Sequence, residues 1–150
     1  MSERESSDPR KVVHRWTRAM TDHNLDAAVA CFAADYHDVT PTRPGQEFRG
    51  QDHVRKNFVA LFEAVPDLTA DLIRVAADGD IVWMEWRMHG ARVDGSRFEF
   101  AGVNIFGVRD DQFVWGRIYT HPVSEQGNIE AQVARMTTGS SDPKQRRGRA

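Results

Sequence analysis

The chain has 150 residues, of which 40% are hydrophobic, and its formal net charge is −2 at pH 7. A chain of this length and composition fits one domain with a single hydrophobic core. The last stretch, residues 137–150, is basic, so the remainder holds 16 basic and 21 acidic residues. An acidic body argues against a nucleic-acid partner, and we expect none.

The cysteine count and the hydropathy pattern indicate the cellular compartment. Cys31 is the single cysteine, so no disulfide framework can form within the chain, and a reducing interior is expected. No apolar run approaches the roughly 18 residues of a membrane span, and the N-terminal residues lack the apolar stretch of a signal peptide. These features predict a cytoplasmic protein with no membrane partner.

The first half of the chain has helical patterns. Residues 1–9 are charged and serine-rich, and we predict that they are disordered. Apolar residues at spacings of three and four then predict a helix over residues 10–22, and Asn24 or Asp22 can cap a short second helix. A short edge strand is expected over residues 35–40, and a third helix over residues 51–65.

Alternating strands replace helices after Pro66. Asp78-Gly79 and Asp94-Gly95 are tight-turn signals between long alternating runs. They predict an antiparallel meander of four strands, over residues 68–77, 80–91, 96–108 and 113–121. A weak terminal helix is expected over residues 126–136, and residues 137–150 have the composition of a disordered tail.

Three helices followed by a meander predict an α+β domain over residues 10–125. We expect a cone-shaped α+β barrel, in which the helices pack in a strongly curved, mostly antiparallel sheet. The helices would cover one face of the sheet without filling the mouth of the cone, which leaves a natural pocket for a small molecule.

The strand over residues 81–89 has two contrasting faces. Trp83, Glu85, Arg87 and His89 share one face, and four apolar residues share the other. The mixed face can line a polar-floored pocket, or it can be an exposed face with a cross-strand ion pair. In the second case Arg87 pairs with Glu85 and is only structural.

The order of these predicted elements is similar to that of a known family. The chain resembles the SnoaL-like branch of the nuclear-transport-factor-2-like superfamily over about residues 10–125. The resemblance is carried by the segments CFAADYHDVTP, FRGQDHVRKNF, VPDLTADLIRVAADGDIVWMEW and FEFAGVNIFGVRDDQFVWGRIYTHP. Members include polyketide cyclases, ketosteroid isomerases, limonene-type epoxide hydrolases and domains that only bind or associate, so the resemblance supports the fold more than the reaction.

The catalytic motifs of enzymes in that family can be matched to single positions of this sequence. The Tyr-x-Asn of the epoxide hydrolases falls on Tyr36 and Asp38, and their Arg-x-Asp falls on Arg87 and His89. Their second catalytic aspartate falls on Ile118, and the base of the ketosteroid isomerases falls near Thr40. Neither dyad is intact, so neither mechanism transfers unchanged.

The resemblance also implies which side chains line the pocket. The expected catalytic residues are Asp38 as the base, His89 as a proton relay, and Arg87 with Tyr36 as the pair that stabilises charge. The expected ligand-binding residues are Thr40, Glu85, Phe98, Phe100, Asn104 and Ile118. No metal site and no phosphate loop are apparent, so we expect no metal and no cofactor.

Two functions remain open from the sequence. One is a cofactor-independent isomerase, cyclase or hydrolase that acts on a small oxygenated hydrophobic molecule. The other is a non-catalytic domain that binds a small hydrophobic ligand or dimerises. We expect a homodimer in either case, because Val82, Met84, Trp86 and Met88 would need cover if they lay on the convex face of the sheet.

Overall fold

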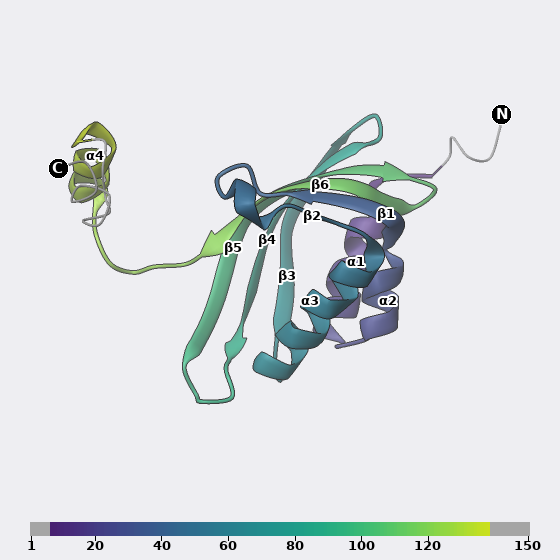
Figure 1. Cartoon of the computed structure of the whole chain (residues 1–150), viewed down its shortest axis with the longest axis horizontal. Coiled ribbons are helices and arrows are strands. Elements are labelled where there is room, and N and C mark those ends of the chain that lie inside the picture. The colour runs from purple at the N-terminus through teal and green to yellow at the C-terminus, as the bar shows by residue number, and fades with distance from the viewer. Residues whose placement is uncertain (1–6, 139–150) are drawn as a thin grey trace.

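The computed structural model describes residues 7–138, and it has helices on one face of a single curved sheet (Figure 1). Helix α1 (Arg10–Thr21) buries Val12, Val13, Trp16 and Met20 at helical spacing, as their periodicity predicts. Helix α2 (Leu25–Ala30) begins at Asn24, whose side chain accepts a hydrogen bond from the backbone of Ala27. Helix α3 (Gln51–Ala64) ends just before Pro66.

The sheet has six strands in the order β2-β1-β6-β5-β4-β3. Four of them form the meander: β3 (Thr69–Asp78), β4 (Ile81–Ala91), β5 (Arg97–Arg109) and β6 (Gln112–Pro122). The first strand, β1 (Phe32–Val39), pairs in parallel with β6, and every other pairing is antiparallel. The predicted α+β fold, with three N-terminal helices against a curved and mostly antiparallel sheet, is confirmed.

The region around the first strand differs from the expectation in detail. Strand β1 begins at Phe32 rather than at residue 35, and it is not an edge strand, because the two-residue strand β2 (Phe48–Arg49) covers it. A single 3₁₀ turn, η2 (Pro44–Gln46), lies between them. A pairing of two residues carries almost no periodicity, so the sequence gives no signal for it.

The core is an aromatic cluster between α1 and the sheet. The Trp16 ring lies 4.8 Å from that of Trp86, and it makes edge-on contacts with Phe32, Phe106 and Phe113. Phe106 and Phe113 stack at 4.0 Å from neighbouring strands. These contacts fix how α1 sits on the sheet, and so fix one wall of the cavity described below.

The two faces of β4 are opposite to the expectation. Val82, Met84 and Trp86 are buried under the helices, whereas Trp83 is exposed on the outer face. The physical reason is that the concave face is the one that the helices cover, and burial there favours the continuous apolar set over a set with three ionisable groups. The prediction that this apolar face lies on the convex side of the sheet and forms a dimer surface is therefore wrong, because the face is part of the core.

The C-terminal part extends away from the sheet. Helix α4 (Ile129–Thr138) follows an extended segment and lies apart from the body (Figure 1). It overlaps the helix expected over residues 126–136. The predicted disordered N-terminus and basic tail fall mainly on residues 1–6 and 139–150, which lie outside the described residues. Among the described helices, none is long and apolar enough to cross a membrane.

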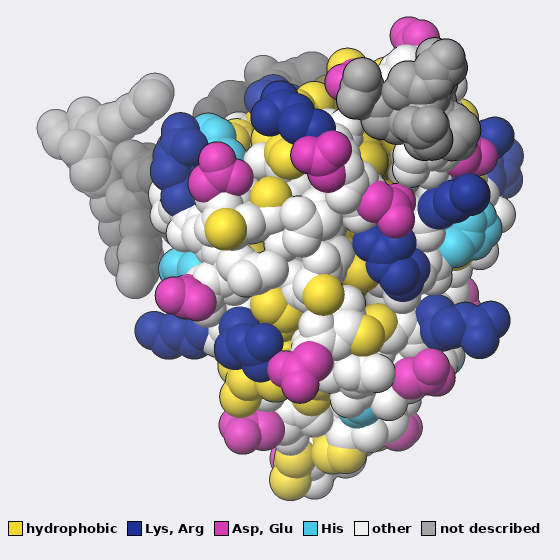
Figure 2. Space-filling view, turned by 90° about the vertical axis from the view of Figure 1, so that its right-hand side faces the viewer, with side chains coloured by type: hydrophobic (Ala, Val, Ile, Leu, Met, Phe, Trp, Pro, Cys, Tyr) yellow, Lys and Arg dark blue, Asp and Glu magenta, His cyan; other side chains and the backbone are white. Residues whose placement is uncertain are grey.

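The surface on the side of α1, α2 and β1 is mixed. Basic and acidic side chains alternate on it, with small apolar areas between them (Figure 2). Arg15 with Asp111 and Arg55 with Asp26 are examples of its exposed ion pairs. Such pairs contribute little to stability.

Candidate functional site

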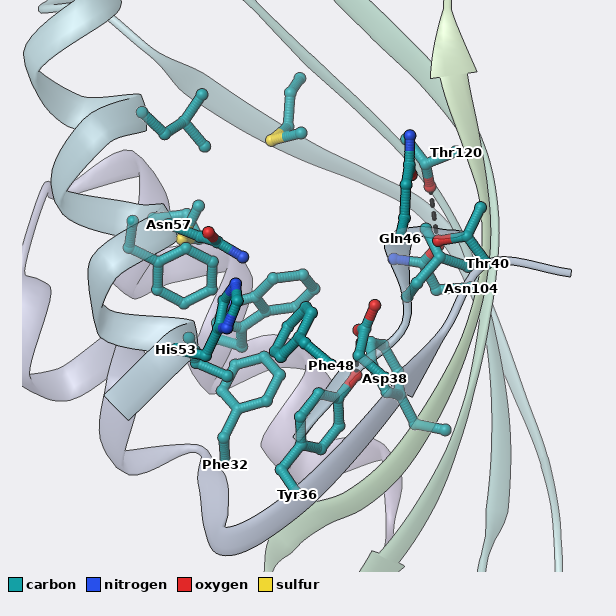
Figure 3. A pocket seen from close by; sticks show the side chains of 18 of the residues that line it. Phe32, Tyr36, Asp38, Thr40, Gln46, Phe48, His53, Asn57, Asn104 and Thr120 are labelled. Carbon is teal, nitrogen blue, oxygen red and sulfur yellow. Dashed lines mark hydrogen bonds between the residues drawn. The ribbon is translucent and has the colours of Figure 1, made fainter. Parts of the chain in front are cut away.

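A cavity of about 450 Å³ lies between the helices and the concave face of the sheet. Its walls come from α1, α3, the segment around β2, and the inner faces of β1, β4, β5 and β6. Much of the lining is aromatic or aliphatic, including Trp16, Phe32, Phe58, Trp86, Met88 and Ile118. The polar side chains of the lining lie partly on the sheet and partly at the mouth (Figure 3). An apolar cavity with a few placed polar groups is typical of a small-molecule site.

The first polar pair is Tyr36 with Asp38, both on the inner face of β1. The Tyr36 hydroxyl donates to Asp38 Oδ1 over 2.7 Å, and both residues are buried. Gly116 on β6 makes room for that hydroxyl, because a β-carbon there would overlap it and the Phe106 ring. The bond occupies one carboxyl oxygen of Asp38, and the side chain still borders the cavity.

Burial changes the acidity of this pair. Desolvation raises the pKa of Asp38 above its ordinary value of 3.8, and this effect exceeds the opposing effects of the Tyr36 hydrogen bond and of His37 and His53. The pKa of Tyr36 is raised as well, first by its own burial and then by the Asp38 charge. Tyr36 therefore stays protonated as a donor, while Asp38 is a better proton acceptor than an exposed aspartate.

The second polar group on the sheet is a chain of hydrogen bonds that ends at Asn104. Trp86 Nε1 donates to Thr120 Oγ1 over 2.7 Å, and Thr120 Oγ1 donates to Asn104 Oδ1 over 2.8 Å. The Thr120 hydroxyl thus accepts from the indole nitrogen, which can only donate, and gives its single hydrogen to the Asn104 carbonyl oxygen. The Asn104 NH₂ group is left as a donor.

This chain of hydrogen bonds therefore fixes the polarity of a buried amide. Asn104 is 2% exposed and lines the cavity on the same side as Asp38 (Figure 3). Its NH₂ group makes no hydrogen bond within the described chain. The cavity wall thus holds a proton acceptor on β1 and an oriented hydrogen-bond donor on β5.

Exposed polar residues form the mouth. Gln46 comes from η2, and His53 and Asn57 from the face of α3 across the cavity from Asp38 (Figure 3). The His53 ring stacks on Phe48 at 4.2 Å. His37 lies between Tyr36 and Asp38 on β1, so its side chain points away from the cavity. There it bonds Glu47 at 2.5 Å.

Six of the ten side chains expected in the pocket line the cavity, namely Tyr36, Asp38, Thr40, Phe100, Asn104 and Ile118. Phe98 is buried, but it packs at 4.8 Å against the Phe100 ring instead of lining the cavity. The catalytic and binding roles assigned to the six remain predictions.

The other three expected residues lie on the outer face of the sheet, and their placement in the pocket is wrong. Arg87 pairs with Glu99 at 2.8 Å and with Asp71 at 3.3 Å. His89 bonds Asp71 at 2.9 Å, and Glu85 pairs with Arg74 rather than with Arg87. The open alternative of an exposed face with cross-strand ion pairs is the arrangement that the structure has.

The residues that sequence reasoning missed belong mainly to the opposite face of β4 and to the mouth. Trp86 and Met88 lie on the apolar face of that strand, and a correct face assignment would have found them. Thr120 follows from alternation with Ile118 on β6. Gln46, His53 and Asn57 carry no such signal, because only the tertiary packing of α3 and η2 brings them to the cavity.

A curved, open, mixed sheet with helices on its concave face is also the fold of a solved structure described as a nuclear-transport-factor-2-like protein. The model of the SnoaL-like domain family matches residues 13–115, so the chain belongs to that family. No curated protein matches the chain.

Solved structures show the same fold at low sequence identity. A Mycobacterium tuberculosis protein in complex with estradiol-17β-hemisuccinate is 20% identical, with a TM-score of 0.64 over 75% of this chain and 94% of that one. An epoxide hydrolase from M. tuberculosis is 18% identical, with a TM-score of 0.63 over 73% and 75%. A putative polyketide cyclase from Sinorhizobium meliloti is 20% identical, with a TM-score of 0.57 over 71% and 92%.

Proposed function

We propose that the protein is a cofactor-independent enzyme that moves a proton on a small, largely apolar molecule bearing an oxygen function. The observation that carries the proposal is the pairing of a buried carboxyl of raised pKa, Asp38, with the oriented amide donor of Asn104 in one apolar cavity. The isomerase, cyclase and hydrolase reactions that the sequence suggested share this need for a base and a donor to developing negative charge.

The proposed step is a proton transfer that balances within the site. The free oxygen of the Asp38 carboxylate takes a proton from a carbon next to a carbonyl, and the electron pair moves to the carbonyl oxygen. Asn104 donates a hydrogen bond to that oxygen while its negative charge develops. Return of the proton to a different atom gives an isomer and restores Asp38.

The substrate class follows from the lining. A cavity of about 450 Å³ holds a molecule of one to three fused rings, and its apolar walls favour one with few polar atoms. The structurally similar M. tuberculosis protein is in complex with a steroid ester, which supports a ligand of that character.

Exchange of hydrogen for deuterium in a ketone tests the proposal without knowledge of the natural substrate. 2-Decalone incubated in D₂O with the wild-type protein should lose its α-hydrogens at a rate above the buffer rate, as followed by proton NMR. Asp38→Asn should abolish the excess rate, because an amide cannot accept the proton. Lys56→Gln, on the exposed side of α3, is a matched control that should not change it.

A binding-only function is the alternative. It is favoured by the fact that Asp38 is the one acidic side chain on the cavity wall within residues 7–138, so no second carboxyl is present to complete a dyad. Saturable ketone binding by the wild-type protein with no excess exchange at any pH between 5 and 9 would establish this alternative over the enzyme.

We further propose that the chain forms a homodimer through the outer face of the sheet. Trp83 is 38% exposed there, and the register places it beside Ile105 on β5, with Val103 and Tyr119 on the neighbouring outer positions. Light scattering should give twice the chain mass, and Trp83→Glu should halve it. A wild-type protein that is monomeric at tens of micromolar would exclude the dimer.

A further inference from the structure

A second cavity of about 420 Å³ shares one lining residue, Phe100, with the first. Phe100 lies on the inner face of β5 and is half-buried. The second cavity is bounded by the start of β5, by Arg92 in the β4–β5 hairpin, and by the segment Val123–Gln126 that follows β6. That segment is held in place by a backbone hydrogen bond of 3.0 Å from Val123 to Glu99.

The walls of the two cavities differ in chemistry. The first is mainly apolar, whereas the second is lined by Arg92, Arg97, Glu99, Ser124, Glu125 and Gln126 together with a few apolar groups. A ligand that extends past Phe100 would therefore leave apolar surroundings and enter charged ones. The chemistry of its far end follows from which of those charges has no partner.

Three of the four charged side chains that line the second cavity already form ion pairs. Arg97 bonds Glu99, and it also lies 3.4 Å from Glu125. Glu99 is bonded by Arg87 as well, and this bond is the main reason why the pKa of Glu99 is lowered. Glu99 is therefore ionised at neutral pH, and the two carboxylates are matched by the guanidinium groups of Arg87 and Arg97.

Arg92 is the cation that remains. Among the described residues it forms no ion pair, and its guanidinium donates to the Arg97 carbonyl oxygen at 2.5 Å and to the Ser96 hydroxyl at 3.3 Å. The neighbouring carboxyl of Asp94 is engaged by the backbone and the hydroxyl of Ser96. The four charged side chains that line the cavity sum to zero, and Asp94 keeps its negative charge near Arg92. Arg92 is nevertheless the one lining cation that forms no ion pair within residues 7–138.

An aromatic contact ties Arg92 to the wall between the cavities. Its guanidinium lies 5.4 Å over the Phe98 ring, and that ring lies 4.8 Å from the Phe100 ring. The cation–π contact holds the charge at the end of the second cavity next to the shared wall. A guanidinium held in this way retains donors for an anion, since it has five N–H groups.

We propose that this second cavity is a subsite for an anionic arm of the ligand, a carboxylate or a phosphate monoester, which binds Arg92. The proposal rests on the proposed function of the first cavity, which would hold the apolar body of the same molecule. The ligand is then an elongated amphiphile, with a ring system against Trp86 and Met88 and a charged end beyond Phe100.

A series of ω-(2-naphthyl)alkanoic acids with two to eight methylene groups tests the subsite by isothermal titration calorimetry. Each acid is compared with its primary amide, which is a neutral molecule of the same shape. One arm length should give an acid that binds about tenfold more tightly than its amide, the size of one hydrogen bond to a charged group. The phosphate monoester of the same length then shows which anion is preferred.

Three variants locate the effect. Arg92→Gln should remove the preference for the acid and leave the affinity of the amide unchanged. Arg74→Gln, which removes an exposed guanidinium on the outer face, is the matched control and should keep the preference. Phe100→Ala removes the shared wall, so acids with shorter arms should gain the preference.

The outcomes separate the two proposals. Acids that bind no better than amides at every arm length, or a preference that survives Arg92→Gln, would overturn the subsite while leaving the first cavity as the binding site. Failure of acids and amides alike to bind would overturn the first cavity as a site for apolar bodies, and the subsite with it.

Discussion

The Tyr36 hydroxyl donates to Asp38 Oδ1 over 2.7 Å, and the two residues lie two positions apart on the same strand. Alternation along a strand places both side chains on the same face, so this pairing is built into one short run of sequence. The bond does two things. It satisfies one oxygen of a buried carboxyl, and it lowers the pKa of Asp38 against the larger effect of burial.

Replacement of Tyr36 by Phe should raise the pKa of Asp38 further, because desolvation then acts without the opposing hydrogen bond. The ascending limb of the pH profile for 2-decalone exchange should move to higher pH. The free energy of unfolding should fall by about 1–3 kcal/mol, the cost of an unsatisfied buried polar group. Chemical denaturation gives the second quantity, and an unmoved pH profile would contradict the assigned role of the hydroxyl.

Replacement of Asp38 by Asn should stabilise the protein at neutral pH while abolishing exchange. A carboxyl whose pKa is raised in the folded state binds its proton more tightly there than in the unfolded chain. Stability is then lost as pH rises from the ordinary value of 3.8 through the raised pKa.

The asparagine variant does not ionise, so it escapes that loss. Its melting temperature should exceed that of the wild type at pH 7, and the two should converge below about pH 4, where both side chains are neutral. Calorimetry across that range measures the difference. A variant less stable than the wild type at pH 7 would mean that the folded site favours the charged carboxylate.

Replacement of Gly116 by Ala should disturb the same pair from the neighbouring strand. The new methyl group would overlap the Tyr36 hydroxyl and the Phe106 ring, so the core must shift. We expect a loss of about 1–3 kcal/mol in unfolding free energy, typical of overpacking. Gly45→Ala is the control, because nothing lies within 4 Å of a β-carbon there and its stability should hardly change.

Much of the fold was predictable from local patterns, and the site only in part. The helices and the meander follow from periodicity and from turns such as Asp94-Gly95. The choice between the two faces of β4 was not decidable from the strand itself. It depends on which face α1 covers, and Trp16 settles that by packing on Trp86 from a distant part of the sequence.

The same limit explains which site residues were found. Tyr36 and Asp38 share a face on a short strand, and Asn104 interrupts an apolar face, so each is visible locally. The donor role of Asn104 was not visible, because it depends on Thr120 and Trp86 from two other strands. Hydrogen bonds across a sheet need the register of three strands, which sequence patterning does not supply.

Replacement of Thr120 by Val tests the chain of hydrogen bonds that orients Asn104. Valine has nearly the shape of threonine but can neither accept from Trp86 Nε1 nor donate to Asn104 Oδ1. The amide of Asn104 is then free to turn its carbonyl oxygen toward the cavity, where it would repel the developing charge on a ketone oxygen. The rate of 2-decalone exchange at saturation should fall about tenfold or more, the range for one lost donor to an oxyanion.

Two further measurements separate this positioning role from a general loss of stability. Thr120→Ser keeps the hydroxyl and loses only the methyl group of threonine. It should therefore retain most of the exchange rate. The KM for the ketone should change less than the rate at saturation, because the oriented donor acts mainly on charge that develops in the transition state. Equal rates for the valine and serine variants would show that the Thr120 hydroxyl does not control the orientation of Asn104.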